Sequence, residues 1–312
     1  MKGLELSRRY YLEFGAAMIR ECAPGLEGVL AIGLAGSGSE CYGYDDEKSK
    51  DHDFEPGFCI FVPDDTDERT RFALERAYSK LPHEFMGYER QHIAPAGGSR
   101  HGVISQGDFF RARIGRPDAE LTLREWMRIP DSYLAEVVNG EIFRDDAGVF
   151  TAARKRLSSM PRDVRLKKLS GQLMLMSQSG QYNYPRAVSR GDGFSAQLAL
   201  FEFVRHAMGV CFTLCDRYMP FYKWRPRAFS ELPRLSELYD ALEYLITTDN
   251  DKKTASVKTQ VIDDIAKTII NELAAESLVS TDTTDLSRCA IRCNDMIADP
   301  DVRNLHILYA VE

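Results

Sequence analysis

The segment that most constrains the fold is residues 30–62, in which two apolar runs enclose a glycine- and serine-rich turn and an acidic loop. The first run, residues 29–34, predicts a buried strand. It is followed by Gly36-Ser37-Gly38-Ser39, and a second run at residues 58–62 predicts another strand. Asp51-His52-Asp53 stands shortly before this second run. The pattern therefore predicts a turn with exposed backbone donors beside a pair of carboxylates.

This combination is suited to binding a phosphate and a metal ion together. Glycines let backbone N–H groups come close to phosphate oxygens, and a serine hydroxyl adds a donor. Asp51 and Asp53 are two residues apart, so on a strand they point to the same face. Mg²⁺ prefers a few carboxylates together with substrate phosphates, and two such ions would stabilise the attacking and leaving oxygens of a displacement. We therefore expect an NTP with one or two Mg²⁺ ions.

A Gly-Ser pair after a strand, then residues 40–50, then Asp-x-Asp in a second strand, resembles the DNA polymerase beta-like nucleotidyltransferase superfamily. Both Gly36-Ser37 and Gly38-Ser39 fit that pattern. Four longer sequence segments resemble a bacterial group of the superfamily that is defined only as a domain of unknown function: GLAGSGSE, SKDHDFEPGF, SGQYNYPR and FYKW. The resemblance implies an α/β (α+β) nucleotidyltransferase-like domain with a small mixed sheet, followed by an all-helical domain.

The order of predicted elements agrees with this plan. Helical periodicity is seen at residues 4–20 and 64–81, and further strands are expected at 101–105 and 140–144. Strand signals then stop. Helices are predicted at residues 151–160, 163–179, 193–218, 235–247, 255–277 and 285–298. We therefore predict a catalytic domain at residues 1–148 and a helical domain at residues 149–312, with small ligands favoured in a cleft between them.

Composition limits the kinds of molecule that the chain is expected to bind. A chain of 312 residues with 44% hydrophobic and 28% charged residues is typical of a globular protein, and its net charge of −7 disfavours a long nucleic acid. A short RNA end stays open, because a local basic wall could form from Arg90, Arg100, Arg186, Lys223, Arg225 and Arg227.

The expected location is the cytoplasm. The first twenty residues lack an apolar signal region, and the seven scattered cysteines are expected to be reduced thiols. The most apolar predicted helix, near residues 194–218, contains Glu202 and Arg205, so no membrane span is expected.

Other candidate residues are less tightly specified. Enzymes of the superfamily commonly use a third carboxylate on a later strand, and Asp108 is the nearest candidate here, although a residue after glycine at a strand end also fits a helix cap. Lys223 lies between aromatic residues and could bind a triphosphate, or it could simply extend into solvent. Lys167 and Lys168 could contact phosphate or form solvated surface. Residues 177–186 are expected to be a polar break between helices.

The sequence thus predicts a Mg²⁺-dependent nucleotidyltransferase. It would transfer NMP from an NTP to a hydroxyl of a small molecule or a protein and release pyrophosphate. The resemblance assigns the metal ions to Asp51 and Asp53 and the phosphates to Gly36, Ser37, Gly38 and Ser39. The alternative is a nucleotide-binding sensor or regulatory protein that kept the fold and lost the catalytic base, since no carboxylate is evident in the third strand.

Overall fold

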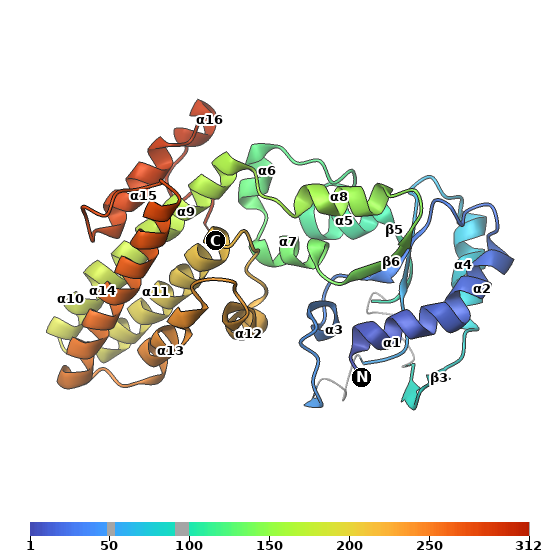
Figure 1. Cartoon of the computed structure of the whole chain (residues 1–312), viewed down its shortest axis with the longest axis horizontal. Helices are drawn as coiled ribbons and strands as arrows, with labels where there is room; N and C mark the ends of the chain where they lie inside the picture. Colours follow the sequence, from blue (N-terminus) through green and yellow to red (C-terminus); the bar gives the residue numbers. More distant parts are fainter. Residues whose placement is uncertain (49–53, 91–99, 312) are drawn as a thin grey trace. The chain divides into compact units, whose positions relative to one another are not determined.

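The computed structural model describes residues 1–48, 54–90 and 100–311, and it forms two compact units (Figure 1). The first unit contains residues 1–120 and 133–159, and the second contains residues 121–132 and 160–312. The sequence analysis placed one boundary at residue 148. In the structure α8 (Val149–Leu157) belongs to the first unit, and a short earlier segment belongs to the second.

The first unit is built on a small mixed sheet, as predicted. Its strands are β1 (Ala31–Leu34), β2 (Cys59–Val62), β5 (Gly102–Ser105) and β6 (Glu141–Asp145), in the order β5-β2-β1-β6. β1 is antiparallel to both β2 and β6, whereas β2 and β5 are parallel. All four predicted strands are confirmed. A separate hairpin is formed by β3 (Glu84–Phe85) and β4 (Tyr88–Glu89).

Both faces of the sheet are covered, because alternate side chains of a strand point to opposite sides. Ile60 and Val62 of β2 belong to the apolar core shared with α1 (Gly3–Tyr10), α2 (Ala16–Cys22) and α4 (Glu68–Ser79). Phe61 points the other way. Its ring centroid lies 4.2 Å from that of Phe150 in α8 and 5.1 Å from that of Phe109 in α5 (Gln106–Ile114).

The helix predicted at residues 4–20 is present, with one irregularity. A π-helical segment, Tyr11–Gly15, joins α1 to α2. A Cβ at Gly15 would overlap the ring of Phe58, so glycine allows this segment to lie directly on the start of the sheet.

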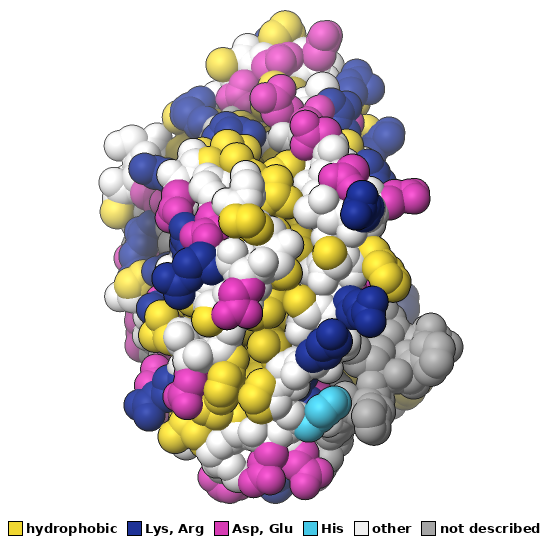
Figure 2. Space-filling view, turned by 90° about the vertical axis from the view of Figure 1, so that its right-hand side faces the viewer, with side chains coloured by type: hydrophobic (Ala, Val, Ile, Leu, Met, Phe, Trp, Pro, Cys, Tyr) yellow, Lys and Arg dark blue, Asp and Glu magenta, His cyan; other side chains and the backbone are white. Residues whose placement is uncertain are grey.

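Apolar side chains also reach the surface of the first unit. Figure 2 shows a band of hydrophobic side chains down one face, with basic and acidic side chains on either side of it. Leu12 and Phe72 are among the exposed apolar residues of this unit, at 63% and 64% exposure.

Every regular element of the second unit is helical over the residues that the structure describes. Its longest helices are α9 (Arg162–Met176), α11 (Gly193–Leu214) and α14 (Lys252–Ala275), and α9 packs against α11. The remaining helices are α6 (Leu123–Arg128), the start of α7 (Asp131–Val138), α10 (Tyr184–Ser189), α12 (Arg225–Ser230), α13 (Tyr239–Thr247), α15 (Leu286–Asp295) and α16 (Pro300–Arg303), with 3₁₀ turns at Tyr222–Trp224 and Ser236–Leu238.

The prediction of a break between helices at residues 177–186 is wrong. A π-helical segment, Ser177–Asn183, continues α9 directly into α10. The polar composition suggested a loop, but the backbone hydrogen bonds of this segment are made within the helix, so its side chains can be polar. Among the described residues, none of the helices combines the length and apolar character needed to cross a bilayer.

Candidate functional site

The glycine-serine turn leaves the end of β1 in a conformation that requires glycine. Gly36 has φ 116° and Gly38 has φ 124°, a region that residues with a Cβ rarely adopt. The short helix α3 (Ser39–Tyr42) begins directly after Gly38. Ser37 is exposed and Ser39 is half-buried. Among the described residues, no acceptor is found for the backbone N–H groups of Ser37 and Gly38.

Asn139 holds this turn in place through its side-chain amide. The Gly36 N–H donates to Asn139 Oδ1 at 2.9 Å, and Asn139 Nδ2 donates to the Gly36 carbonyl at 2.8 Å. The next residue, Gly140, donates its N–H to the Cys41 carbonyl at 2.8 Å. The N–H of Gly36, expected to contact phosphate, is therefore already bonded within the protein.

Two guanidinium groups lie against the glycines. A methyl group added at Gly36 would overlap Arg113, and one added at Gly38 would overlap Arg100. Arg113 also lies 4.2 Å above the Phe109 ring and places Nε 3.3 Å from Glu136 Oε2. Arginine in a fixed fork geometry is well matched to phosphate oxygens. The turn is thus lined by backbone donors and two cations.

The charges around the turn are balanced by two carboxylates. Glu40 forms an ion pair with Arg100, and Glu136 forms one with Arg113. Burial raises the pKa of Glu136, and the neighbouring Arg113 opposes that rise. Burial also lowers the pKa of Arg100. Each arginine of the turn is thus paired with one acid.

Strand register explains why these residues meet. Gly33 pairs with Cys59 and Cys59 pairs with Gly102, so the end of β1, the start of β2 and the start of β5 lie at the same end of the sheet, along the strand direction. Leu34 pairs with Glu141, which brings the start of β6 to that same end. The chain therefore enters β2 beside the turn. Asp51 and Asp53, the predicted metal ligands, lie outside the described residues, so their position stays a prediction.

Asp108 is not brought to the turn. β5 runs parallel to β2, and Asp108 follows its far end, in the first turn of α5. Its exposed carboxylate pairs with Arg111. Ser105, rather than Asp108, caps the helix, because Ser105 Oγ accepts the Asp108 N–H at 3.4 Å. α5 then runs back along the sheet and delivers Arg113 to the turn about 140° round the helix from Asp108.

Lys223 lies in the second unit, on the 3₁₀ turn Tyr222–Trp224. Its side chain is exposed, and Nζ lies 4.9 Å from the centre of the Trp224 ring. This cation–π contact is one that an exposed lysine makes without any ligand. Its predicted contact with a triphosphate stays a prediction.

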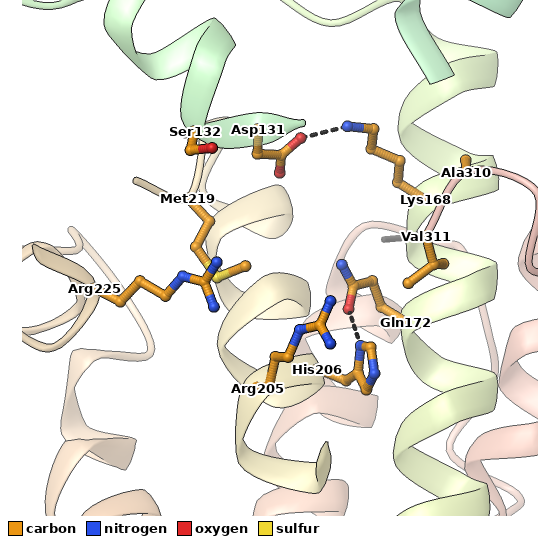
Figure 3. A pocket seen from close by; sticks show the side chains of 10 residues that line it. All are labelled: Asp131, Ser132, Lys168, Gln172, Arg205, His206, Met219, Arg225, Ala310 and Val311. Carbon is orange, nitrogen blue, oxygen red and sulfur yellow. Dashed lines mark hydrogen bonds and ion pairs between the residues drawn. The ribbon is translucent and has the colours of Figure 1, made fainter. Parts of the chain in front are cut away.

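Figure 3 shows a polar cavity that lies entirely within the second unit. Its volume of about 20 Å³ suits a single water molecule. Lys168 of α9 pairs with the carboxylate of Asp131 and donates to the Ile129 carbonyl at 3.3 Å. Arg205 and Arg225 extend toward the same cavity (Figure 3).

The expectation that Lys167 and Lys168 form solvated surface is wrong, because both are buried. Lys167 donates to Asn294 Oδ1 at 2.8 Å and to the carbonyls of Arg303 and Leu305 at 3.1 and 2.6 Å. An ammonium group has three N–H donors, and these three acceptors use them all. Lys167 therefore joins α9 to the C-terminal helices and has no donor left for phosphate.

His206 is buried beside this cavity. Its Nδ1 lies 2.7 Å from Gln172 Oε1, and its Nε2 lies 3.2 Å from Glu202 Oε2. Burial first, and then the nearby Arg205, lower the pKa of His206 to about 4. The imidazole is therefore neutral near pH 7 and adds no charge to the second unit.

The family comparison matches a segment with parts in both units. A family described as a domain of unknown function (DUF4037) matches residues 126–225. This segment contains Lys168, His206 and Lys223 but not the glycine-serine turn. Neither a search of curated proteins nor a search of solved structures found a match.

Sequence reasoning missed Arg113 and Asn139. Both lie far from the turn in the chain, and neither belongs to a recognisable motif. Their approach depends on the strand order β5-β2-β1-β6 and on α5 running back along the sheet. Arg90, another member of the suggested basic wall, has a structural role, because it donates to the Tyr78 carbonyl at 3.1 Å and packs over the Tyr78 ring.

Proposed function

We propose that this chain is a Mg²⁺-dependent nucleotidyltransferase that transfers NMP from an NTP to a hydroxyl of a small molecule or a protein. The observation that carries the proposal is the turn at Gly36 and Gly38, where positive φ angles and two adjacent arginines create a surface rich in hydrogen-bond donors. This surface fits the oxygens of a phosphate chain.

Each part of the proposed site has a separate task. The backbone at Ser37 and Gly38, with Arg100 and Arg113, would bind and orient the triphosphate. Asp51 and Asp53 would hold Mg²⁺, which supplies charge neutralisation for the phosphate oxygens when it is bound. Phosphoryl-type transfer depends mainly on such positioning and on stabilisation of charge.

The second candidate is a nucleotide-binding sensor without transferase activity. It is favoured by the position of Asp108, which lies beyond the far end of β5 from the turn. Among the described residues, the carboxylates that contact the arginines of the turn are Glu40 and Glu136. Since both are held in ion pairs, neither is an obvious base for an incoming hydroxyl.

Thermal unfolding with each NTP, with and without Mg²⁺, tests the common part of the two proposals. A ligand at 100 times its Kd stabilises the native state by about 2.7 kcal/mol, which is about 5–10 °C for a unit of this size. The shift should require Mg²⁺ and disappear in Asp53→Ala. Asp65→Ala, which removes an exposed carboxylate from the same unit, is the matched control.

Pyrophosphate release then separates the candidates. A transferase should release pyrophosphate from the bound NTP when a hydroxyl acceptor is supplied, whereas a sensor should bind the NTP and release none. Absence of a Mg²⁺-dependent shift with all NTPs, or an equal shift in Asp53→Ala, would refute both.

A further inference from the structure

A groove with a volume of about 440 Å³ lies in the second unit. Its walls come from the end of α9 and the π-helical segment (Leu175, Gln178), from α10 and the residues after it (Arg186, Arg190), and from α11 (Leu198). This volume falls in the range of sites for small organic molecules. The groove is separate from the water-sized cavity of Figure 3, although His206 contributes to both.

One wall of the groove is held rigidly by close packing. A Cβ at Gly180, in the π-helical segment, would overlap the ring of Phe203 in α11, so these two helices are in direct contact. Ser179 Oγ donates to the Leu175 carbonyl at 2.6 Å, and Tyr184 is fully buried. π-helical segments of this kind occur frequently at functional sites. The groove is therefore a preformed feature of the helical unit.

Two arginines supply cationic groups to the groove. Arg186 and Arg190 are four residues apart, which places them on one side of the α10 turn. In the part of the chain that the structure describes, neither has a carboxylate within ion-pair distance. Arg186 lies 4.8 Å from the centre of the exposed Tyr182 ring. Both guanidinium groups are exposed to solvent at the groove.

The acidic residues of the groove are already bonded. The Asp192 carboxylate caps α11 and accepts from the Ser195 N–H at 2.9 Å and the Ser195 hydroxyl at 2.5 Å. Glu202 Oε2 lies 3.2 Å from His206 Nε2 and 3.7 Å from Arg205 Nη1. Among the described residues, neither carboxylate is within ion-pair distance of Arg186 or Arg190, although, after the hydrogen bonds from Ser195, the charge of Arg190 helps to lower the pKa of Asp192. The guanidinium N–H groups of the two arginines are the donors that an anionic ligand would use.

The remaining lining is apolar. Leu175, Ala187, Leu198 and Ala199 form part of the surface of the groove. Leu198 also continues an exposed stripe on α11, in which Phe194, Leu198 and Phe201 are 77%, 51% and 49% exposed. Their spacing, i, i+4 and i+7, places them on one face of the helix. An inorganic ion would leave this apolar surface uncovered, so the groove fits a ligand with an apolar body.

We propose that this groove is a binding site for a small organic anion, a carboxylate or a phosphate monoester with an apolar or aromatic body. Arg186 and Arg190 bind the anionic group, and Leu198 packs against the body. The site does not depend on the proposed nucleotide site, because all the residues that carry it belong to the helical unit.

Isothermal titration calorimetry on the full chain tests the proposal with four probes. Phenyl phosphate and benzoate carry both features, inorganic phosphate lacks the apolar body, and benzyl alcohol lacks the charge. We expect one-to-one binding of phenyl phosphate or benzoate, at least tenfold tighter than either partial probe. Whichever of the two binds more tightly identifies the preferred anionic group.

Four variants locate the binding. Arg186→Gln and Arg190→Gln should each weaken it at least tenfold. Leu198→Trp, at an exposed position where folding is not at risk, should block it by filling the groove. Arg288→Ala, which removes an arginine that is 72% exposed elsewhere in the same unit, should leave it unchanged.

Gly38→Val separates this site from the proposed nucleotide site, and it should leave phenyl phosphate binding intact. The proposal is overturned if neither phenyl phosphate nor benzoate binds, if inorganic phosphate binds as tightly as phenyl phosphate, or if Leu198→Trp binds like the wild type. Loss of binding in Gly38→Val would move the ligand to the other unit and overturn it as well.

Discussion

Asn139→Ala is the most direct perturbation of the turn, because it removes both hydrogen bonds to Gly36 and no main-chain atom. The two bonds measure 2.9 and 2.8 Å. A typical hydrogen bond contributes about 0.5–1.5 kcal/mol to stability, so the pair should contribute about 1–3 kcal/mol to the free energy of unfolding of the first unit. For a unit of this size, 1 kcal/mol lowers Tm by about 2–4 °C, and a central value of about 2 kcal/mol predicts a loss of about 4–8 °C.

The assay must report on the first unit. Both tryptophans, Trp126 and Trp224, belong to the second unit, so tryptophan fluorescence follows the helical unit alone. Hydrogen exchange at the backbone amides of β1 and β2 should become faster in Asn139→Ala, while the tryptophan transition should stay near its wild-type position. Binding of Mg²⁺ and NTP should also weaken, since the turn is no longer held in the bound conformation.

Asn139→Asp is the informative companion variant. The aspartate can still accept the Gly36 N–H but faces the Gly36 carbonyl with a second oxygen, which cannot donate. It should therefore be at least as destabilising as alanine. If Asn139→Ala unfolds like the wild type and retains NTP binding, the amide does not hold the turn and the account of the site is wrong.

Three further perturbations have defined outcomes. Gly38→Val places a branched side chain at φ 124° and against Arg100. It should abolish the Mg²⁺-dependent increase in Tm with NTP. Gly43→Val, at another positive φ outside the glycine-serine turn, should lower Tm but keep that increase. Lys168→Met removes the ion-pair partner of the buried Asp131 carboxylate, which costs about 3–5 kcal/mol. In urea unfolding followed by tryptophan fluorescence, the double variant Lys168→Met with Asp131→Asn should recover part of that loss. Equal unfolding midpoints for the single and the double variant would contradict the pairing. The pKa of His206 is lowered in the folded state, so the unfolded chain binds the proton more tightly; stability should be fully present above pH 6.5 and fall as pH drops toward about 4, and His206→Gln should reduce that slope between the two pH values.

Local pattern was sufficient where an element is determined by its own residues. The strand at residues 58–62 is a continuous apolar run that is fully buried in the structure, and such runs are recognisable without knowledge of their neighbours. The helical character of residues after 160 likewise follows from periodicity alone. Polar composition was a poorer guide at residues 177–183, where a π-helix satisfies the backbone internally and leaves side chains free to be polar.

By itself, the sequence determined the four strand segments, the helical second part and the need for glycine at the turn, because each depends on residues that are close together in the chain. Only the tertiary structure decided which distant side chains reach that turn. Asn139 and Arg113 arrive there through strand register and the return path of α5, and Asp108 is carried to the opposite end of the sheet by the parallel pairing of β2 with β5. These pairings join strands that lie far apart in the chain, so no local motif encodes them.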